Sequence, residues 1–184
     1  MQITGGKYNS RKVQTAEYEN IKPTLSKTRQ GIFNTLSSMI DFEGKVFFDM
    51  FSGSGIMSLE AVSRGFRVIC FEKDKRTALS IKAAFKSLGL TPELYFGDSL
   101  KNIKKTDIKA DVIFLDPPYD SDLYERALEI IKQENKLNEN AIVVMEHPCD
   151  KTINTQGWEV VKTKVYGNKQ ITYLLNADSS FSAL

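Results

Sequence analysis

Short apolar runs alternate with amphipathic stretches along most of the chain. The runs are rich in β-branched and aromatic residues and nearly continuous, as in Val46-Phe47-Phe48, which is typical of strands buried on both faces of a sheet. The predicted strands are residues 46–50, 67–72, 93–97, 111–115 and 141–146. The predicted helices between them are residues 56–64, 75–88, 99–104 and 122–134. This alternation predicts an α/β fold with a mostly parallel sheet and helices on both faces.

The end of the chain follows a different pattern. Residues 158–166 and 170–176 are strand-like runs separated by Gly167-Asn168-Lys169. A short turn between two such runs predicts an antiparallel hairpin, which we expect at one edge of the sheet. With it the sheet has seven strands.

The start of the chain predicts a smaller unit. Residues 2–15 alternate weakly around turn signals, which indicates a small hairpin. Pro23 opens a predicted helix that Gly44 terminates. We therefore divide the chain into a basic arm (1–22), a main domain (23–176) and a polar tail (177–184).

Composition bounds the class of protein. A chain of 184 residues with 41% apolar residues can bury the core of one domain. It has neither a long apolar segment nor an apolar leader, so we expect a soluble, cytoplasmic protein without a membrane partner. Cys70 and Cys149 lack the spacing of metal ligands and are expected to be reduced, buried thiols. His147 is the single histidine, so no metal site is predicted, and we interpret it as structural or rim-lining.

Positive charge is concentrated before residue 30. Residues 1–29 hold six basic and two acidic residues, whereas the remainder holds 19 basic and 21 acidic ones. Such a segment is either a contact for a polyanion or a solvated arm, and charge alone does not decide between them. The candidate RNA contacts are Lys7, Arg11, Lys12, Lys22 and Arg29.

A glycine-containing loop, residues 49–55, follows the first strand of the α/β unit. Ligands of open α/β sheets bind beyond the carboxyl ends of the strands, and glycine lets the backbone approach them closely. The loop lacks the third glycine of a dinucleotide fingerprint. Asp49 would repel a pyrophosphate and attract a cofactor that carries sulfonium and ammonium groups. A purely structural turn is the alternative.

Acidic residues also follow the second and third strands. Glu72 can accept hydrogen bonds from both hydroxyls of a ribose. Asp98 can accept an adenine amino group or cap the next helix, and both roles can coexist. The candidate cofactor contacts are Asp49, Phe51, Ser52, Gly53, Gly55, Glu72, Lys73, Asp98, Ser99 and Asp116.

The tetrapeptide Asp116-Pro117-Pro118-Tyr119 follows the fourth strand. The amino group of a nucleobase is a poor nucleophile, because its lone pair is delocalised into the ring. The Asp116 carboxylate and the Pro117 carbonyl can hold the two hydrogens of such an amine and direct its lone pair. Tyr119 offers a ring on which an extruded base stacks. Asp116, Pro117 and Tyr119 are therefore the candidate catalytic residues, with a proline-rich turn as the structural alternative.

These motifs occur in the order seen in Rossmann-like class I methyltransferases, and the start of the chain resembles the bacterial RsmD family. The segments that carry this resemblance are Ile3-Thr4-Gly5-Gly6-Lys7-Tyr8, Arg11-Lys12, Lys22-Pro23-Thr24 and Arg29-Gln30-Gly31-Ile32-Phe33-Asn34. The likeness extends over about residues 2–175. It implies S-adenosylmethionine as cofactor and methylation of a guanine N2 in 16S ribosomal RNA, free or within an assembling small subunit, by a monomer.

The resemblance also implies roles for individual residues. Asp49, Ser52, Gly53 and Gly55 would line the methionine part of the cofactor. Glu72 would bind the ribose and Asp98 the adenine, while Asp116, Pro117 and Tyr119 would hold the guanine amine. The family usually has Arg, Asp, Arg and Glu where this chain has Lys22, Ser26, Lys27 and Gln30.

Other functions share parts of this pattern. An adenine-N6 methyltransferase would use the same chemistry, but no separate target-recognition domain is present. A protein-glutamine methyltransferase would not need the basic segment. A nicotinamide-dependent oxidoreductase would explain the sheet and the glycine loop, but not Asp49 or the Asp-Pro-Pro-Tyr tetrapeptide. A non-catalytic RNA-binding module would not need an intact cofactor loop.

Overall fold

The computed structural model describes residues 1–14, 24–118 and 122–177, and the structural statements below concern these residues. The helices are α1 (Ser26–Leu36), α2 (Ile56–Ser63), α3 (Lys75–Ser87), α4 (Ser99–Asn102) and α5 (Leu123–Gln133). The strands are β1 (Val46–Asp49), β2 (Arg67–Glu72), β3 (Glu93–Phe96), β4 (Ala110–Leu115), β5 (Leu137–Pro148), β6 (Trp158–Tyr166) and β7 (Lys169–Asn176).

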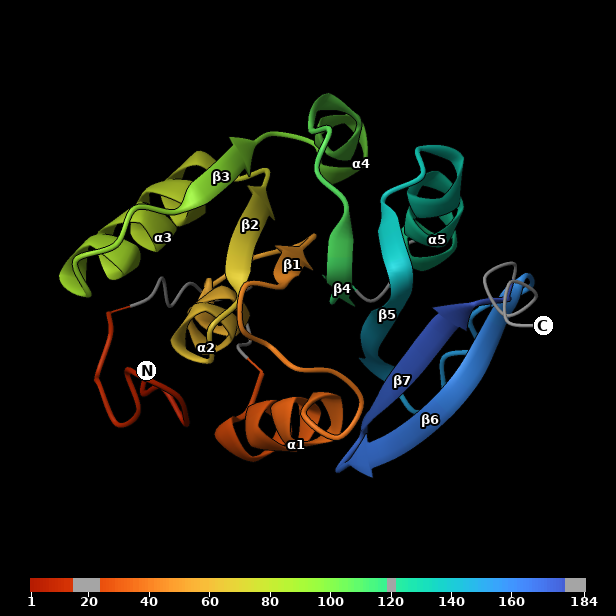
Figure 1. The fold of residues 1–184 in the computed structure, drawn as a ribbon, viewed down its shortest axis with the longest axis horizontal. Coiled ribbons are helices and arrows are strands. Elements are labelled where there is room, and N and C mark those ends of the chain that lie inside the picture. The colour runs from red at the N-terminus through yellow and green to blue at the C-terminus, as the bar shows by residue number, and fades with distance from the viewer. Residues whose placement is uncertain (15–23, 119–121, 178–184) are drawn as a thin grey trace.

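The strands form one seven-stranded sheet in the order β3-β2-β1-β4-β5-β7-β6. The first five are parallel, and β7 pairs antiparallel with both β5 and β6. The predicted C-terminal hairpin is therefore confirmed, with β6 as the outermost strand (Figure 1). The turn between β6 and β7 contains Gly167 at φ 64°, a conformation that glycine adopts without strain.

Helices cover both faces of the sheet, as predicted. Buried residues of α1, α2 and α3 belong to one hydrophobic cluster, and those of α4 and α5 belong to a second cluster on the opposite face. Figure 1 shows the two groups of helices on either side of the twisted sheet. Because both faces are covered, all six residues of β4 are buried, which explains the apolar run Val112-Ile113-Phe114-Leu115. Asp111 is the charged exception, and its carboxylate accepts from the Val46 N–H at 2.8 Å.

The largest departure from the predicted elements is the length of β5. It begins at Leu137 rather than at residue 141. Its first part is polar and half-exposed, so apolar pattern does not reveal it. Asn140 lies within this part at φ 57°, and the pairing with β4 shifts register between Ala110 and Val112. The irregularity allows one strand to continue across a stretch that looks like a loop in sequence.

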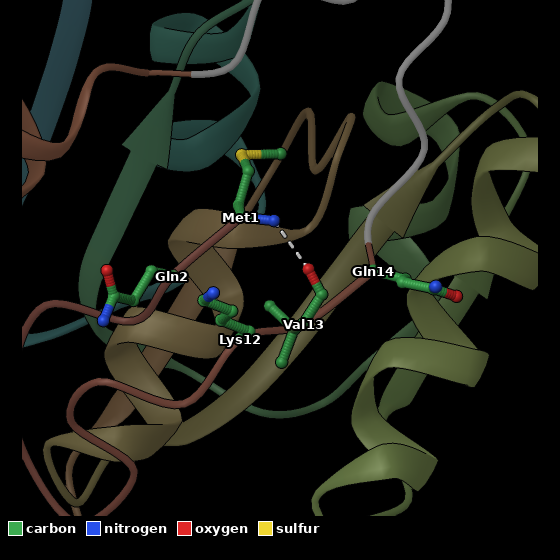
Figure 2. Close-up of a pocket in the computed structure, with 5 residues that line it drawn as sticks. All are labelled: Met1, Gln2, Lys12, Val13 and Gln14. Atoms are coloured by element: carbon green, nitrogen blue, oxygen red, sulfur yellow. Dashed lines mark hydrogen bonds between the residues drawn. The ribbon is translucent and has the colours of Figure 1, made fainter.

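The first 14 residues fold back on themselves, as expected for a small hairpin. A single antiparallel bridge joins Gln2 to Lys12, and the Met1 amino group donates a hydrogen bond to the Val13 carbonyl at 2.6 Å (Figure 2). Ile3 and Val13 are buried in the same cluster as α1 and α2. The segment is thus packed on the main domain. Figure 2 shows a pocket beside this segment, lined by Met1, Gln2, Lys12, Val13 and Gln14.

The helix predicted to open at Pro23 is α1, which begins at Ser26. Pro23 itself lies outside the described residues. None of the helices in the described part of the chain has the length and apolar character needed to cross a bilayer.

Candidate active site

Three carboxylates from neighbouring strands gather at the carboxyl edge of the sheet. Asp49 ends β1, Asp116 follows β4, and Glu146 lies near the end of β5. Each of these acids lies two positions after a residue of the hydrophobic cluster that packs against α1, α2 and α3. Because side chains alternate between the two faces along a strand, all three carboxylates point toward the face that these helices cover. The parallel register pairs Leu115 with Met145, which places Asp116 beside Glu146.

Asp49 is almost completely buried, with 1% of its surface exposed. Its carboxylate accepts a hydrogen bond from the Ser58 hydroxyl of α2 at 2.6 Å. Burial raises the pKa of Asp49 to about 7, although the Ser58 hydrogen bond opposes this change. A carboxylate in this state gains strongly from a nearby positive charge.

The loop after β1 is tied to the end of β2. Ser52 donates its backbone N–H to the Phe71 carbonyl at 3.0 Å, and its hydroxyl accepts from the Phe71 N–H at 3.1 Å. Gly53 donates its N–H to the Glu72 carboxylate at 2.8 Å. Gly53 and Gly55 have φ of 48° and 75°, and a Cβ on Gly55 would lie 2.9 Å from a carbon of Ile81. Both glycines are therefore required by the shape of the loop.

Glu72 is 8% exposed and is held by two backbone donors. Besides Gly53, the N–H of Asp74 donates to it at 2.8 Å. Burial raises its pKa, and these hydrogen bonds work against the rise. Its carboxylate is thus fixed at the edge of the sheet, where a pair of ribose hydroxyls is predicted to bind.

The other predicted cofactor contacts lie along the same edge. Asp98 caps α4 by accepting from Leu100 N–H at 2.9 Å and Lys101 N–H at 3.3 Å, so the capping role of this residue is confirmed. Ser99 is buried as the first residue of α4, Lys73 is exposed after β2, and Phe51 is half-buried in the glycine loop. Their contacts with a cofactor stay predictions.

The catalytic tetrapeptide is described in part. Asp116 is partly exposed, Pro117 is buried and Pro118 is exposed, whereas Tyr119 lies outside the described residues. Desolvation raises the pKa of Asp116 well above its ordinary value, and the charges of Glu146 and Asp49 raise it further. Lys169 opposes this effect.

Sequence reasoning missed Glu146 and its two partners. The Glu146 carboxylate accepts from the Thr24 hydroxyl at 3.0 Å and pairs with the Lys169 ammonium group at 3.1 Å. The available signal was one acidic residue in the apolar run of β5, directly before His147. His147 is buried, with ring nitrogens 3.0 Å from the Thr172 hydroxyl and the Pro148 carbonyl, which confirms a structural role.

Two predictions about individual side chains are wrong. Arg29 was predicted to contact RNA, but it is 3% exposed and is bound to Glu60, the Thr24 carbonyl and the Gln2 carbonyl. Cys149 was predicted to be buried but is exposed, because it follows the end of β5; Cys70 is buried as expected.

The remaining basic candidates have different outcomes. Lys7, Arg11 and Lys12 are exposed on the N-terminal hairpin, so they are available to a polyanion. Lys22 lies outside the described residues.

The edge as a whole is lined by acidic residues. Asp49, Glu72, Asp98 and Asp116 all lie at or just beyond the ends of parallel strands. This donor set fits S-adenosylmethionine, which carries two positive groups and a ribose, and disfavours the pyrophosphate of a nicotinamide cofactor. Within residues 1–14, 24–118 and 122–177, no cluster of three or more metal-ligating side chains occurs.

Comparison with known proteins gives consistent matches over nearly the whole chain. The model of the family described as "Conserved hypothetical protein 95" matches residues 1–175. A relative from Haemophilus influenzae named "Ribosomal RNA small subunit methyltransferase D" is 30% identical over 91% of this chain and 89% of its own length.

Solved structures match as well. A crystal structure from Haemophilus influenzae aligns with a TM-score of 0.76 at 29% identity, covering 95% of this chain and 97% of the other. An RNA methyltransferase from Salinibacter ruber, solved in complex with S-adenosyl-L-homocysteine, aligns with a TM-score of 0.61 at 17% identity, covering 83% and 92%. The fold of this chain is that of class I methyltransferases.

Proposed function

This chain belongs to the family described as "Conserved hypothetical protein 95", and from that membership we propose that it transfers a methyl group from S-adenosylmethionine to the exocyclic N2 amino group of a guanine in 16S ribosomal RNA. Relatives named "Ribosomal RNA small subunit methyltransferase D" support the reaction and the substrate. The observation that carries the proposal in this structure is the placement of Asp49, Glu72 and Asp116 along one edge of the sheet.

Residues after the first three parallel strands would hold the cofactor. Asp49 would attract its positive groups, the backbone of the loop containing Gly53 would lie against it, and Glu72, which already accepts from Gly53, would accept from its ribose hydroxyls. Asp98 would accept from the adenine while keeping its role as a cap. When bound, S-adenosylmethionine supplies an electrophilic methyl group.

Residues after β4 would hold the acceptor. The Asp116 carboxylate and the Pro117 carbonyl each accept a hydrogen bond from the guanine amine, which favours a nitrogen whose lone pair points at the methyl group. Pro117 is buried, so this carbonyl belongs to a rigid part of the site. Tyr119 would stack on the base, and that contact contributes about 1–3 kcal/mol in comparable sites.

The RNA would approach over the N-terminal hairpin. Lys7, Arg11 and Lys12 are exposed there. Lys22 is a further RNA contact predicted from the sequence. We also propose that the protein is a cytoplasmic monomer and that its substrate is ribosomal RNA within an assembling small subunit.

The decisive experiment is methylation in vitro followed by nucleoside mass spectrometry. Purified protein is incubated with labelled S-adenosylmethionine and either free small-subunit RNA or partly assembled particles that lack the modification. We expect N2-methylguanosine, with more product from particles than from free RNA. A methyladenosine as the labelled product would refute the guanine assignment, and labelled protein in place of RNA would refute the substrate class.

A further inference from the structure

Glu146 is a buried acid with no role in the predicted site. It is 3% exposed. Its carboxylate is bound by Thr24, which precedes α1 in the chain, and by Lys169, the first residue of β7. These partners come from segments far apart in the chain, so the carboxylate has a fixed position.

Stability does not explain why a carboxylate stands here. Removing an acid and a lysine from water costs free energy that their mutual attraction commonly fails to recover. Replacing such a pair by apolar residues of similar volume is often neutral or stabilising. The placement of Glu146 next to Asp116 offers a chemical explanation instead.

The charged groups around Asp116 come from four elements. Glu146 on β5 and Asp49 on β1 are acidic, Lys169 on β7 is basic, and Tyr124 on α5 lies close enough to interact with its charge. Tyr124 donates its hydroxyl to the Glu146 carbonyl at 2.5 Å, so it also fixes the backbone of β5 at this point. Asp116 thus experiences two negative neighbours and one positive neighbour, and Lys169 is already paired with Glu146.

We propose that Glu146 is a positioning residue for methyl transfer, whose fixed carboxylate beside Asp116 strengthens Asp116 as the acceptor of the proton that the amine must lose. This inference rests on the proposed function. As the new nitrogen–carbon bond forms, the bond between carbon and sulfur breaks and the sulfur keeps the electron pair. One N–H proton of the amine then passes to the Asp116 carboxylate, which becomes neutral. Burial raises the pKa of Glu146 as well, the Thr24 hydrogen bond opposes that rise, and the ion pair with Lys169 favours the ionised form that this step needs.

The arrangement makes a prediction about pH. Asp116 must be ionised to accept, and its pKa is raised by burial and by Glu146. Methyl transfer therefore declines as the pH falls through that raised pKa. Removing the charge of Glu146 moves the decline to lower pH, whereas removing the charge of Lys169 moves it to higher pH.

The test compares three variants of the full chain. Glu146→Gln is expected to shift the acidic limb of the pH profile of kcat/KM downward by about one unit, and Lys169→Met to shift it upward by a similar amount. Lys169→Arg keeps the charge and is expected to leave the limb in place. A loss of activity with no shift, or shifts in the same direction for the first two variants, would overturn the inference and leave Glu146 a structural residue.

A second readout needs no turnover. The Asp116 carboxyl group is titrated by carbon NMR in cofactor-free protein, with its signal assigned by its loss in Asp116→Asn. We expect the same opposite shifts in Glu146→Gln and Lys169→Met, and an unchanged titration in both would contradict the proposal. If wild-type protein methylates no RNA while the titrations still shift, the proposed function fails and the electrostatic coupling of the two carboxylates stands.

Discussion

The backbone N–H of Gly53 donates a hydrogen bond to the carboxylate of Glu72 at 2.8 Å. The Glu72 side chain therefore fixes the shape of the loop after β1 and is also the carboxylate that we propose to accept hydrogen bonds from the cofactor ribose. The relationship requires Gly53 to stay at φ 48°, where a side chain is strained.

We predict that Gly53→Ala weakens cofactor binding by about 5- to 150-fold, since strain of about 1–3 kcal/mol would shift the loop away from Glu72. The measurement is titration calorimetry with S-adenosylhomocysteine. Gly44→Ala is a matched control, because Gly44 also has positive φ, at 73°, but lies before β1 with open space around it. Both variants should lose some thermal stability, and only Gly53→Ala should lose affinity. If Gly53→Ala bound S-adenosylhomocysteine as tightly as wild type, the loop would not be part of the cofactor site.

The local hydrophobic pattern predicted most of the elements, because burial on both faces favours nearly continuous apolar runs in the central strands. The acids at the strand ends could be located in the same way, since parallel strands bring their carboxyl ends together. Pattern failed for the first part of β5, whose polar residues pair with β4 across a register shift.

Long-range partners explain the other failures. Arg29 looks like a surface cation until α2 brings Glu60 to within 2.9 Å, from 31 residues further along the chain. In the sequence Glu146 resembles an ordinary acid at a strand end, but in the fold its carboxylate is buried and bound by Thr24 and Lys169. In each case the charge is visible in the sequence, but the partner that buries it is set by packing.

Asp49 should make cofactor binding depend on pH. Its pKa is raised to about 7, and the ionised form attracts the positive cofactor. Affinity should therefore rise with pH up to about 7 and then level off, with uptake of cofactor accompanied by release of a proton. Calorimetry in buffers of different ionisation enthalpy measures both effects. Affinity that stays constant from pH 5 to 8 in wild type would exclude Asp49 as the titrating group.

The same pKa affects folding in the cofactor-free protein. The pKa of Asp49 in the folded protein lies above the ordinary value of 3.8. Such a carboxyl contributes its full stability when the pH is below 3.8, and this contribution is lost as the pH rises to about 7. Asp49→Asn should therefore stabilise the protein more at pH 8 than at pH 4, by a difference of at most roughly 4 kcal/mol. Denaturant unfolding at the two pH values provides the measurement. If Asp49→Asn changed the free energy of unfolding by the same amount at pH 4 and at pH 8, the raised pKa would be contradicted.

Asp116→Asn should separate chemistry from cofactor binding. The amide preserves the shape of the side chain but removes the negative charge that holds the amine and accepts its proton. We expect methyl transfer to fall at least about 100-fold in single-turnover measurements, as for the loss of other preorganised charge-stabilising groups. The affinity for S-adenosylhomocysteine should change only a few-fold. Near-normal turnover would eliminate Asp116 as the centre of the reaction.

Arg11 and Arg29 form a matched pair that separates an exposed arginine available to RNA from a buried structural one. Arg29→Met leaves the buried Glu60 with Arg64 as its remaining ion-pair partner, and it frees the Thr24 and Gln2 carbonyls. It should reduce the free energy of unfolding by about 3 kcal/mol. Arg11→Met changes an exposed side chain, so folding should be nearly unaffected.

The effect of Arg11→Met should appear in RNA binding instead. If Arg11 neutralises one phosphate, its loss lowers the steepness of the salt dependence of affinity by about one unit in a plot of log K against log salt concentration. Filter binding or fluorescence anisotropy over a range of salt concentrations gives this slope, and chemical unfolding of both variants gives the stability. An unchanged slope for Arg11→Met, with unfolding curves that match wild type, would show that RNA does not approach over the N-terminal hairpin at this residue.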